Sequence, residues 1–173
     1  MINTILERCN KGMYQKLLDI GCGNYGWNHY CFNFLEKVQF KVGLDANIDR
    51  LRTYKGTDWV VLYYDLNEKL PFLDKTFDIC VCLDVIEHLP KDTAIDLILQ
   101  MQMIGKDVVI YTPEGFFDTL LYQKEYVYSD LDVHKCGFTA EELRDLGFHV
   151  NRVGPIFKNK DVCFYGMYGY YIK

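Results

Sequence analysis

Five short apolar segments, separated by stretches of helical character, constrain the fold of this chain more than any other feature of its sequence. Each segment is rich in aliphatic or β-branched residues and ends at a polar residue or a turn signal. Continuously apolar strands are typical of a parallel sheet whose two faces are both covered by helices. The expected strands are Lys16–Ile20, Lys41–Asp45, Trp59–Asp65, Phe77–Leu83 and Asp107–Thr112.

Helical stretches occupy the gaps between these strands, at Trp27–Lys37, Ile48–Tyr54 and Lys91–Met103. In the last of them the apolar residues roughly follow one face of a helix. A repeated order of strand and helix predicts an α/β fold with a doubly wound sheet. The chain has 173 residues, so we expect a single domain over residues 1–173.

The pattern changes after the fifth expected strand. Residues 114–137 contain many aromatic and acidic side chains but show no clear period. Thr139 and Glu142 have the spacing of a capping box, which predicts a short helix that ends at Gly147. Two further strands are expected, at Phe148–Val153 and Val162–Tyr171.

The charge balance and the cysteines exclude several classes of partner. Lysine and arginine number 19 against 24 aspartate and glutamate residues, a net charge of −5, so nucleic acid is not an expected partner. No apolar run approaches the ~18 residues of a membrane span, and the first eight residues lack a signal-peptide core, so no membrane is expected. Seven cysteines without a Cys-x-x-Cys pair favour reduced thiols and a cytoplasmic location.

A glycine-rich loop follows the first expected strand. Residues 21–26 read Gly-Cys-Gly-Asn-Tyr-Gly, which matches the G-x-G-x-x-G motif of dinucleotide-binding proteins. Asp45 ends the next strand, 19 residues beyond Gly26, where a carboxylate can bind both hydroxyls of a ribose. NAD or FAD is therefore one reading of this loop.

Asp19 argues against a dinucleotide. It lies two residues before the loop, where its carboxylate would face an incoming pyrophosphate. Two like charges 4 Å apart cost about 4 kcal/mol at an effective dielectric constant of 20. The same carboxylate would favour a cationic ligand such as S-adenosylmethionine, which carries a sulfonium and an ammonium group. A nicotinamide enzyme is therefore disfavoured.

At this point the sequence resembles the class I S-adenosylmethionine-dependent methyltransferases, over roughly residues 16–153. Four motifs in order carry the resemblance: Leu17 through Gly23, Val42 through Asp45, Asp65-Leu66 followed by Leu70-Pro71-Phe72, and Phe77 through Leu89. The family implies a Rossmann-like sheet of seven mostly parallel strands with the last strand antiparallel, which matches five strands plus two. It also implies S-adenosyl-L-methionine as the cofactor.

The resemblance assigns roles to individual residues. Asp19, Gly21 and Gly23 would lie near the methionine part of the cofactor, and Asp45 at the ribose. Asp65 and Leu66 would contact the adenine, although an aspartate at a strand end is equally common as a turn residue. Asp84 would begin the segment below the methyl donor. Gly26 stands one position later than the third glycine of many family members.

Methyl transfer is an in-line displacement, so alignment of the nucleophile can contribute ~7–11 kcal/mol. A hydroxyl nucleophile also benefits from a general base, for which His88 and His134 are the expected catalytic residues. An amine nucleophile needs only to arrive unprotonated, and the sequence favours neither. As alternatives, His88 could form a helix-terminal hydrogen bond and His134 could be a surface residue.

A sharper alternative concerns metal. Asp84, Glu87, His88 and His134 together resemble the metal-binding set of the small-RNA 3′-terminal 2′-O-methyltransferases, which implies Mg²⁺ or Mn²⁺. The first acid is here Asp, however, and the Asp-Val-Ile-Glu-His-Leu pattern is frequent in metal-free members of the fold. We therefore expect no metal.

Residues 113–137 are expected to form the wall of an open acceptor site and to be held by few backbone hydrogen bonds. They include Phe116, Phe117, Tyr122, Tyr126 and Tyr128 among several acids. Such a rim suits a sugar or glycan, a cationic group or a protein partner better than a polyphosphate. The expected acceptor is therefore a small molecule or a glycan. A third alternative is a non-catalytic, cofactor-binding partner subunit.

Overall fold

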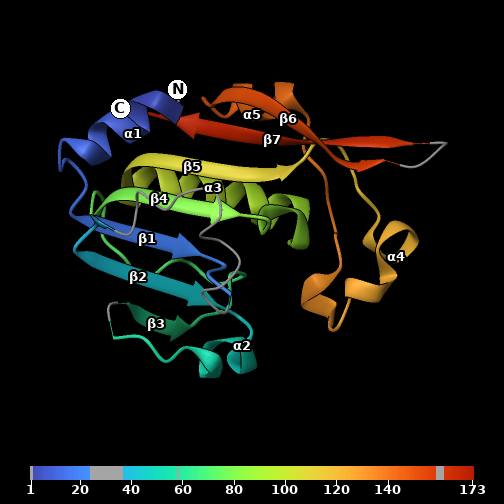
Figure 1. The fold of residues 1–173 in the computed structure, drawn as a ribbon, viewed down its shortest axis with the longest axis horizontal. Helices are drawn as coiled ribbons and strands as arrows, with labels where there is room; N and C mark the ends of the chain where they lie inside the picture. The colour runs from blue at the N-terminus through green and yellow to red at the C-terminus, as the bar shows by residue number, and fades with distance from the viewer. Residues whose placement is uncertain (1, 24–36, 58, 159–161) are drawn as a thin grey trace.

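A seven-stranded sheet forms the centre of the protein in the computed structural model, which describes residues 2–23, 37–57, 59–158 and 162–173. The strand order is β3-β2-β1-β4-β5-β7-β6 (Figure 1). The first five strands are parallel, and β7 pairs antiparallel with both β5 and β6. The strands are β1 (Lys16–Ile20), β2 (Phe40–Asp45), β3 (Val60–Tyr63), β4 (Phe77–Leu83), β5 (Gly105–Pro113), β6 (His149–Lys158) and β7 (Cys163–Tyr171). The predicted fold class is confirmed.

Helices connect and cover these strands. The described α-helices are α1 (Ile2–Asn10), α2 (Ile48–Thr53), α3 (Lys91–Ile104), α4 (Thr119–Tyr122) and α5 (Ala140–Asp145). Single 3₁₀ turns are η3 (Ile86–His88), η4 (Lys124–Tyr126) and η5 (Asp130–Asp132). The helix expected over residues 27–37 lies outside the described residues except for Lys37. None of the described helices combines the length and the apolar character that crossing a bilayer demands.

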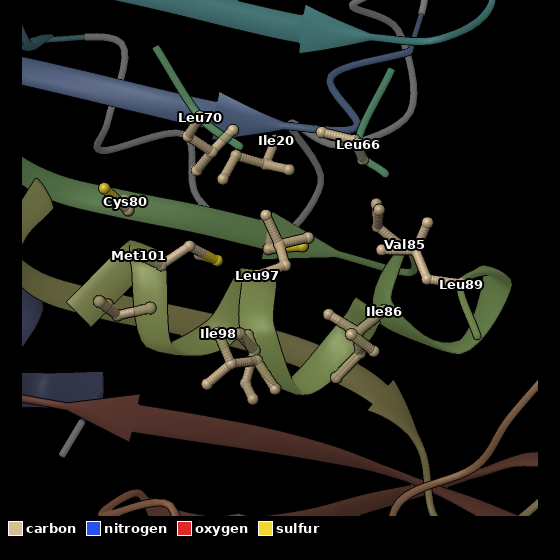
Figure 2. Close-up of a cluster of buried hydrophobic side chains, with 14 of the residues drawn as sticks. Ile20, Leu66, Leu70, Cys80, Val85, Ile86, Leu89, Leu97, Ile98 and Met101 are labelled. Carbon is tan, nitrogen blue, oxygen red and sulfur yellow. The ribbon is translucent and has the colours of Figure 1, made fainter. Parts of the chain in front are cut away.

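The core lies on both faces of the sheet because side chains alternate along the strands. On β4, Cys80 and Cys82 point into one layer, while Ile79 and Val81 point into the other. The first layer is completed by the buried face of α3, as Figure 2 shows for Leu97, Ile98 and Met101. The second layer includes Ile5 of α1, a helix that the sequence analysis did not predict.

The predictions for the strands fail mainly at the sheet edges. β1 and β4 have the predicted bounds, whereas β3 is shorter than expected because Asp65 accepts the backbone N–H of Asn67 (3.0 Å) in a turn. β6 continues past Gly154-Pro155 to Lys158, with an irregular register between Val153 and Phe157. Proline is tolerated there because β6 is an edge strand.

Residues 113–137 contain more local structure than the absence of a period indicated. Asp118 caps α4 through its Oδ1, which accepts the N–H of Leu121 (3.1 Å). Ser129 and Asp132 form a capping box at η5. Each turn is only three or four residues long, which is too short to produce a recognisable period. In Figure 1 the part that carries α4 lies beyond the carboxyl ends of the parallel strands.

Candidate functional site

The glycine loop after β1 packs directly against the segment after β4. Gly21 and Gly23 have φ angles of +70° and +61°, a region that glycine adopts at no steric cost. The Gly21 N–H donates to the carbonyl of Leu44 (2.8 Å). A Cβ atom on Gly21 would lie 2.2 Å from Cγ2 of Val85. The close approach therefore requires glycine at position 21. β1 and β4 are neighbours where the strand order reverses, the place where open α/β sheets bind ligands.

Asp45, at the end of β2, holds the glycine loop in place. Its Oδ2 accepts the backbone N–H of Gly23 (2.8 Å), and its Oδ1 accepts that of Asn47 (2.7 Å). The residue is 6% exposed. Asp45 thus links the ends of two neighbouring strands, and its carboxylate faces the cavity described below.

Asp19 is buried at the carboxyl end of β1, and one of its carboxyl oxygens has no partner among the described residues. It is 4% exposed, and its Oδ1 has no hydrogen-bond partner there. Burial, and then the negative charge of Asp45, raise the pKa of Asp19 to about 8. A buried carboxyl group of this kind is costly unless it is paired. A cationic group bound beside it would supply the missing interaction.

A cavity of about 110 Å³ lies at the carboxyl ends of β1, β2, β3 and β4, and we call it the cofactor cavity. Five of the seven predicted cofactor residues line it: Gly21, Asp45, Asp65, Leu66 and Asp84. The other two, Asp19 and Gly23, do not line it. Gly23 contributes through its hydrogen bond to Asp45, and the negative charge of Asp45 also acts on Asp19. The structure therefore brings the predicted residues together from the carboxyl ends of four strands, β1, β2, β3 and β4.

A second cavity of about 300 Å³ adjoins the first, and we call it the acceptor cavity. Asp84, His88 and Asp132 line both cavities, so a group at their boundary is accessible from either side. The remaining lining of the acceptor cavity is Tyr111, Pro113, Phe117, Thr119, Gln123, Tyr126, Val127, His134, Ile156 and Phe157.

His88 and His134, both predicted as catalytic, meet in the acceptor cavity although they are 46 residues apart. Their ring centroids are 4.6 Å apart at an interplanar angle of 82°. Nδ1 of His88 lies 3.3 Å from the carbonyl oxygen of Val133. Burial, and then the neighbouring His134, lower the pKa of His88 to about 4. Burial also lowers the pKa of His134. Both imidazoles are therefore neutral at pH 7 and can accept a proton.

Glu87 lies next to the two histidines and is 1% exposed. Its Oε2 accepts the hydroxyl of Thr112 (2.9 Å), whereas its Oε1 is buried and has no partner among the described residues. Burial, and then the charge of Asp84, raise its pKa well above the ordinary value. One ligand atom each from Glu87, His88 and His134 lie within 4.8 Å of one another. The sequence analysis had considered Glu87 only as part of the metal-binding alternative.

Asp84 occupies an unusual backbone conformation at the boundary of the two cavities. Its φ angle is +54°, which is uncommon for any residue other than glycine and is enriched at functional sites. Its side chain is exposed towards the cavities, yet desolvation by the surrounding protein raises its pKa to about 6. The structure thus places Asp84 between the two cavities.

An ion pair that the sequence analysis missed joins the two cavities. Arg50 of α2 contacts Asp132 of η5, with 2.5 Å between Nη2 and Oδ1. Asp132 also accepts the N–H groups of Tyr128 (3.0 Å) and Ser129 (2.9 Å). The partners are 82 residues apart, and no local pattern connects them.

The five aromatic residues expected in the acceptor wall take different positions. Phe117 and Tyr126 line the acceptor cavity. Tyr122 does not line it but stacks on Phe117 with a centroid distance of 5.6 Å. Phe116 and Tyr128 are 52% and 80% exposed and lie outside the lining. The wall therefore also takes rings from elsewhere, such as Phe157 of β6.

Known protein sequences resemble this chain over part or most of its length. A family model described as a methyltransferase domain matches residues 18–101. An uncharacterized protein of Methanocaldococcus jannaschii is 27% identical over 150 residues, which cover 86% of this chain. The matched part is 61% of that protein, so the chain spans about three fifths of the relative's length.

Solved structures share the fold at low sequence identity. The YcgJ protein of Bacillus subtilis has a TM-score of 0.65 at 12% identity, covering 99% of this chain and 97% of that one. A methyltransferase dependent on S-adenosylmethionine from Methanosarcina mazei has a TM-score of 0.63 at 16% identity, covering 91% and 92%. Magnesium protoporphyrin IX methyltransferase of Synechocystis, with S-adenosylhomocysteine bound, has a TM-score of 0.59 at 14% identity, covering 98% and 81%. The family model over residues 18–101 and this shared fold together confirm the resemblance of the chain to the class I S-adenosylmethionine-dependent methyltransferases.

Proposed function

We propose that this protein transfers the methyl group of S-adenosylmethionine to an oxygen or nitrogen atom of a small acceptor, such as a metabolite or a single sugar of a glycan. The observation that carries the proposal is the adjoining pair of cavities, which share Asp84, His88 and Asp132. One cavity is lined by five residues to which the resemblance to the methyltransferases assigns contacts with the cofactor. The other contains two neutral imidazoles within reach of an acceptor.

The residues at the ends of β1 and β2 fit a cationic nucleoside cofactor. The buried Oδ1 of Asp19 is without a partner among the described residues, and Gly21 leaves no room for a side chain. Asp45 would bind the ribose hydroxyls, and Asp19 would balance the positive charge of the methionine part. When bound, the cofactor supplies an electrophilic methyl group.

The acceptor cavity limits the size and chemistry of the acceptor. Its volume of about 300 Å³ is at the lower end for small-molecule pockets. A small molecule or one protruding sugar would fit it better than a long polymer segment. A hydroxyl acceptor could give its proton to His88 or His134, which are neutral at pH 7 because burial lowers the pKa of both.

Titration calorimetry with S-adenosylmethionine and with NAD tests the cofactor. We expect binding of the former only. The Asp45→Ala variant should bind it about 1.5–3 kcal/mol more weakly, roughly ten- to a hundredfold, because hydrogen bonds to a charged group are lost. Asp49→Ala is a matched control, since Asp49 is on the same side of the sheet but its side chain is 85% exposed and pairs only with Arg52 among the described residues. Equal affinities of the Asp45 variant and the unchanged protein would show that the ribose assignment is wrong.

A second candidate function is metal-assisted methyl transfer of the RNA 2′-O-methyltransferase kind. The observation that favours it is the group of ligand atoms of Glu87, His88 and His134 within 4.8 Å. One carboxylate and two imidazoles would suit a divalent ion such as Mn²⁺ or Mg²⁺. The acidic net charge of −5 does not favour an RNA acceptor.

We expect methyl transfer to proceed without added divalent metal. Cofactor affinity and turnover should be the same with excess EDTA as without it, because the proposed mechanism needs only neutral imidazoles. The measurement is turnover after dialysis against the chelator, with Mg²⁺ or Mn²⁺ added back in a parallel sample. Loss of activity with EDTA and recovery with either ion would favour the second candidate function.

A further inference from the structure

The lining of the acceptor cavity carries negative charge. Asp84 and Asp132 contribute carboxyl groups, and none of the described residues that line it is a lysine or an arginine. Asp132 is paired with Arg50. Arg50 and Lys135 line the cofactor cavity instead. Asp84 is therefore the source of net charge in the acceptor cavity, and a phosphate or carboxylate on the acceptor would be repelled there.

Aromatic rings form much of the remaining lining. Tyr111, Phe117, Tyr126 and Phe157 all contribute to it. Phe117 is 3% exposed and is held edge to face against Phe164 at a centroid distance of 4.8 Å, so its ring is fixed by packing. The faces of aromatic rings attract cations, more strongly where water is excluded. A cation at this place would thus be favoured by both the carboxyl group and the rings.

Two buried polar atoms at or beside the acceptor cavity lack hydrogen-bond partners. Within the described part of the chain, Oε1 of Glu87 and Nδ1 of His134 are buried and have no hydrogen-bond partner. Their ligand atoms lie within 4.8 Å of each other and of a nitrogen of His88, which lines the cavity. An unsatisfied buried polar atom is costly, so a ligand with N–H donors would be favoured beside the unpaired nitrogen of His134. An ammonium group has three N–H donors, whereas a hydroxyl group has one.

We propose that the acceptor is a cationic amine carried on a small aromatic or apolar body. The proposal rests on the proposed methyltransferase function and narrows its acceptor. The amine enters as an ammonium ion and loses one proton to solvent. Its nitrogen lone pair then forms the new N–C bond, while the bond from that carbon to the sulfonium sulfur breaks and leaves its electron pair on sulfur. The products are the methylated amine, which carries the positive charge, and S-adenosylhomocysteine.

Binding of matched small molecules to the protein saturated with S-adenosylhomocysteine tests this proposal. The probes are phenethylamine, 2-phenylethanol, 3-phenylpropionate and methyl glucoside, measured by titration calorimetry. We expect phenethylamine to bind at least about tenfold more tightly than any other probe, since charge-assisted hydrogen bonds contribute about 1.5–3 kcal/mol. Equal or tighter binding of the alcohol, the carboxylate or the sugar would overturn the proposal, as would no binding of the amine.

Two pairs of variants locate the effect. Asp84→Asn should remove the preference for the amine, whereas Asp130→Asn, which makes the same charge change at an exposed residue outside the lining, should keep it. Tyr126→Ala should weaken amine binding several-fold, and Tyr128→Ala, at a residue 80% exposed, should not. Affinity for S-adenosylhomocysteine is measured first on every sample. If that binding is absent from the unchanged protein, the proposed function fails; if it is present without amine preference, only the acceptor assignment fails.

Discussion

Replacing Asp19 by asparagine is expected to stabilise the protein and to weaken its binding of S-adenosylmethionine. Burial raises the pKa of this carboxyl group from 3.8 to about 8. Below about pH 4 the group is neutral in both the folded and the unfolded state. As the pH rises from about 4 to 8, the unfolded state ionises first, so the free energy of unfolding falls. Above pH 8 this one group makes the free energy of unfolding lower than it is below pH 4, by on the order of 5 kcal/mol.

Asparagine removes this ionisation but leaves a buried amide, which costs about 1–3 kcal/mol when unpaired. We therefore expect the Asp19→Asn variant to be about 2–4 kcal/mol more stable at pH 8, with a Tm roughly 5–15 °C higher. Its stability should also depend less on pH between 4 and 8. Cofactor affinity should fall about tenfold or more, because the charge opposite the ammonium or sulfonium is lost. Urea unfolding across this pH range and calorimetry measure the two effects.

Asp78→Asn is the matched control for this variant. Asp78 lies near the amino end of β4, whereas Asp19 lies near the carboxyl end of the neighbouring β1. The Asp78 carboxylate accepts the N–H groups of Gln15 (2.8 Å) and Lys16 (3.0 Å) and forms an ion pair with Lys106 (2.7 Å). Burial alone would raise its pKa, but these hydrogen bonds outweigh burial and lower the pKa. Asp78→Asn should therefore destabilise the protein and leave cofactor affinity unchanged. A destabilised Asp19→Asn variant with normal cofactor affinity would mean that Asp19 is a structural residue.

Replacing Gly21 by alanine is expected to abolish cofactor binding and to destabilise the fold. Alanine at a φ angle of +70° costs about 1–2 kcal/mol. Its Cβ would also overlap Val85, 2.2 Å away, and such overpacking costs typically about 1–3 kcal/mol. The combined loss of about 2–5 kcal/mol displaces the loop that lines the cofactor cavity. Thermal unfolding and titration with S-adenosylmethionine measure the two effects.

Gly12→Ala separates the backbone effect from the overlap. Gly12 has a φ angle of +67°, but a Cβ there meets nothing within 4 Å. The Gly12→Ala variant should lose only the stability that backbone strain costs, about 1–2 kcal/mol. Its cofactor binding should be unchanged. Gly23→Ala, also in open space at a φ angle of +61°, should lose about as much stability as Gly12→Ala, because alanine keeps the backbone N–H that donates to Asp45. Equal behaviour of Gly21→Ala and Gly12→Ala would contradict the packing argument.

The central strands could be predicted from the sequence because both of their faces are buried. β1 and β4 are apolar along their length and have the predicted bounds. β3 and β6 are edge strands that are largely exposed, so apolar runs do not define their ends. α1 was not predicted, because its contacts with the sheet are distant in sequence. Arg8 of α1, for example, donates to the buried Asp107 of β5 at 2.6 Å. That contact joins residues 99 positions apart.

The cofactor cavity could be predicted better than the acceptor cavity for a related reason. Asp45 ends β2 and Asp84 follows β4, and the carboxyl ends of parallel strands lie at one edge of the sheet. By contrast, Arg50 of α2, Asp132 of η5 and Phe157 of β6 come together at the site through tertiary packing, which no local pattern indicates. His88 and His134 were predicted from residue type, but their contact at 4.6 Å was not.

A crystal structure with S-adenosylhomocysteine bound tests the account most directly. The account predicts the ribose hydroxyls at the carboxylate of Asp45, the amino group of the methionine part near Asp19, and the sulfur facing the acceptor cavity beside His88 and His134. S-adenosylhomocysteine bound away from Asp45, or with its sulfur turned away from that cavity, would contradict it.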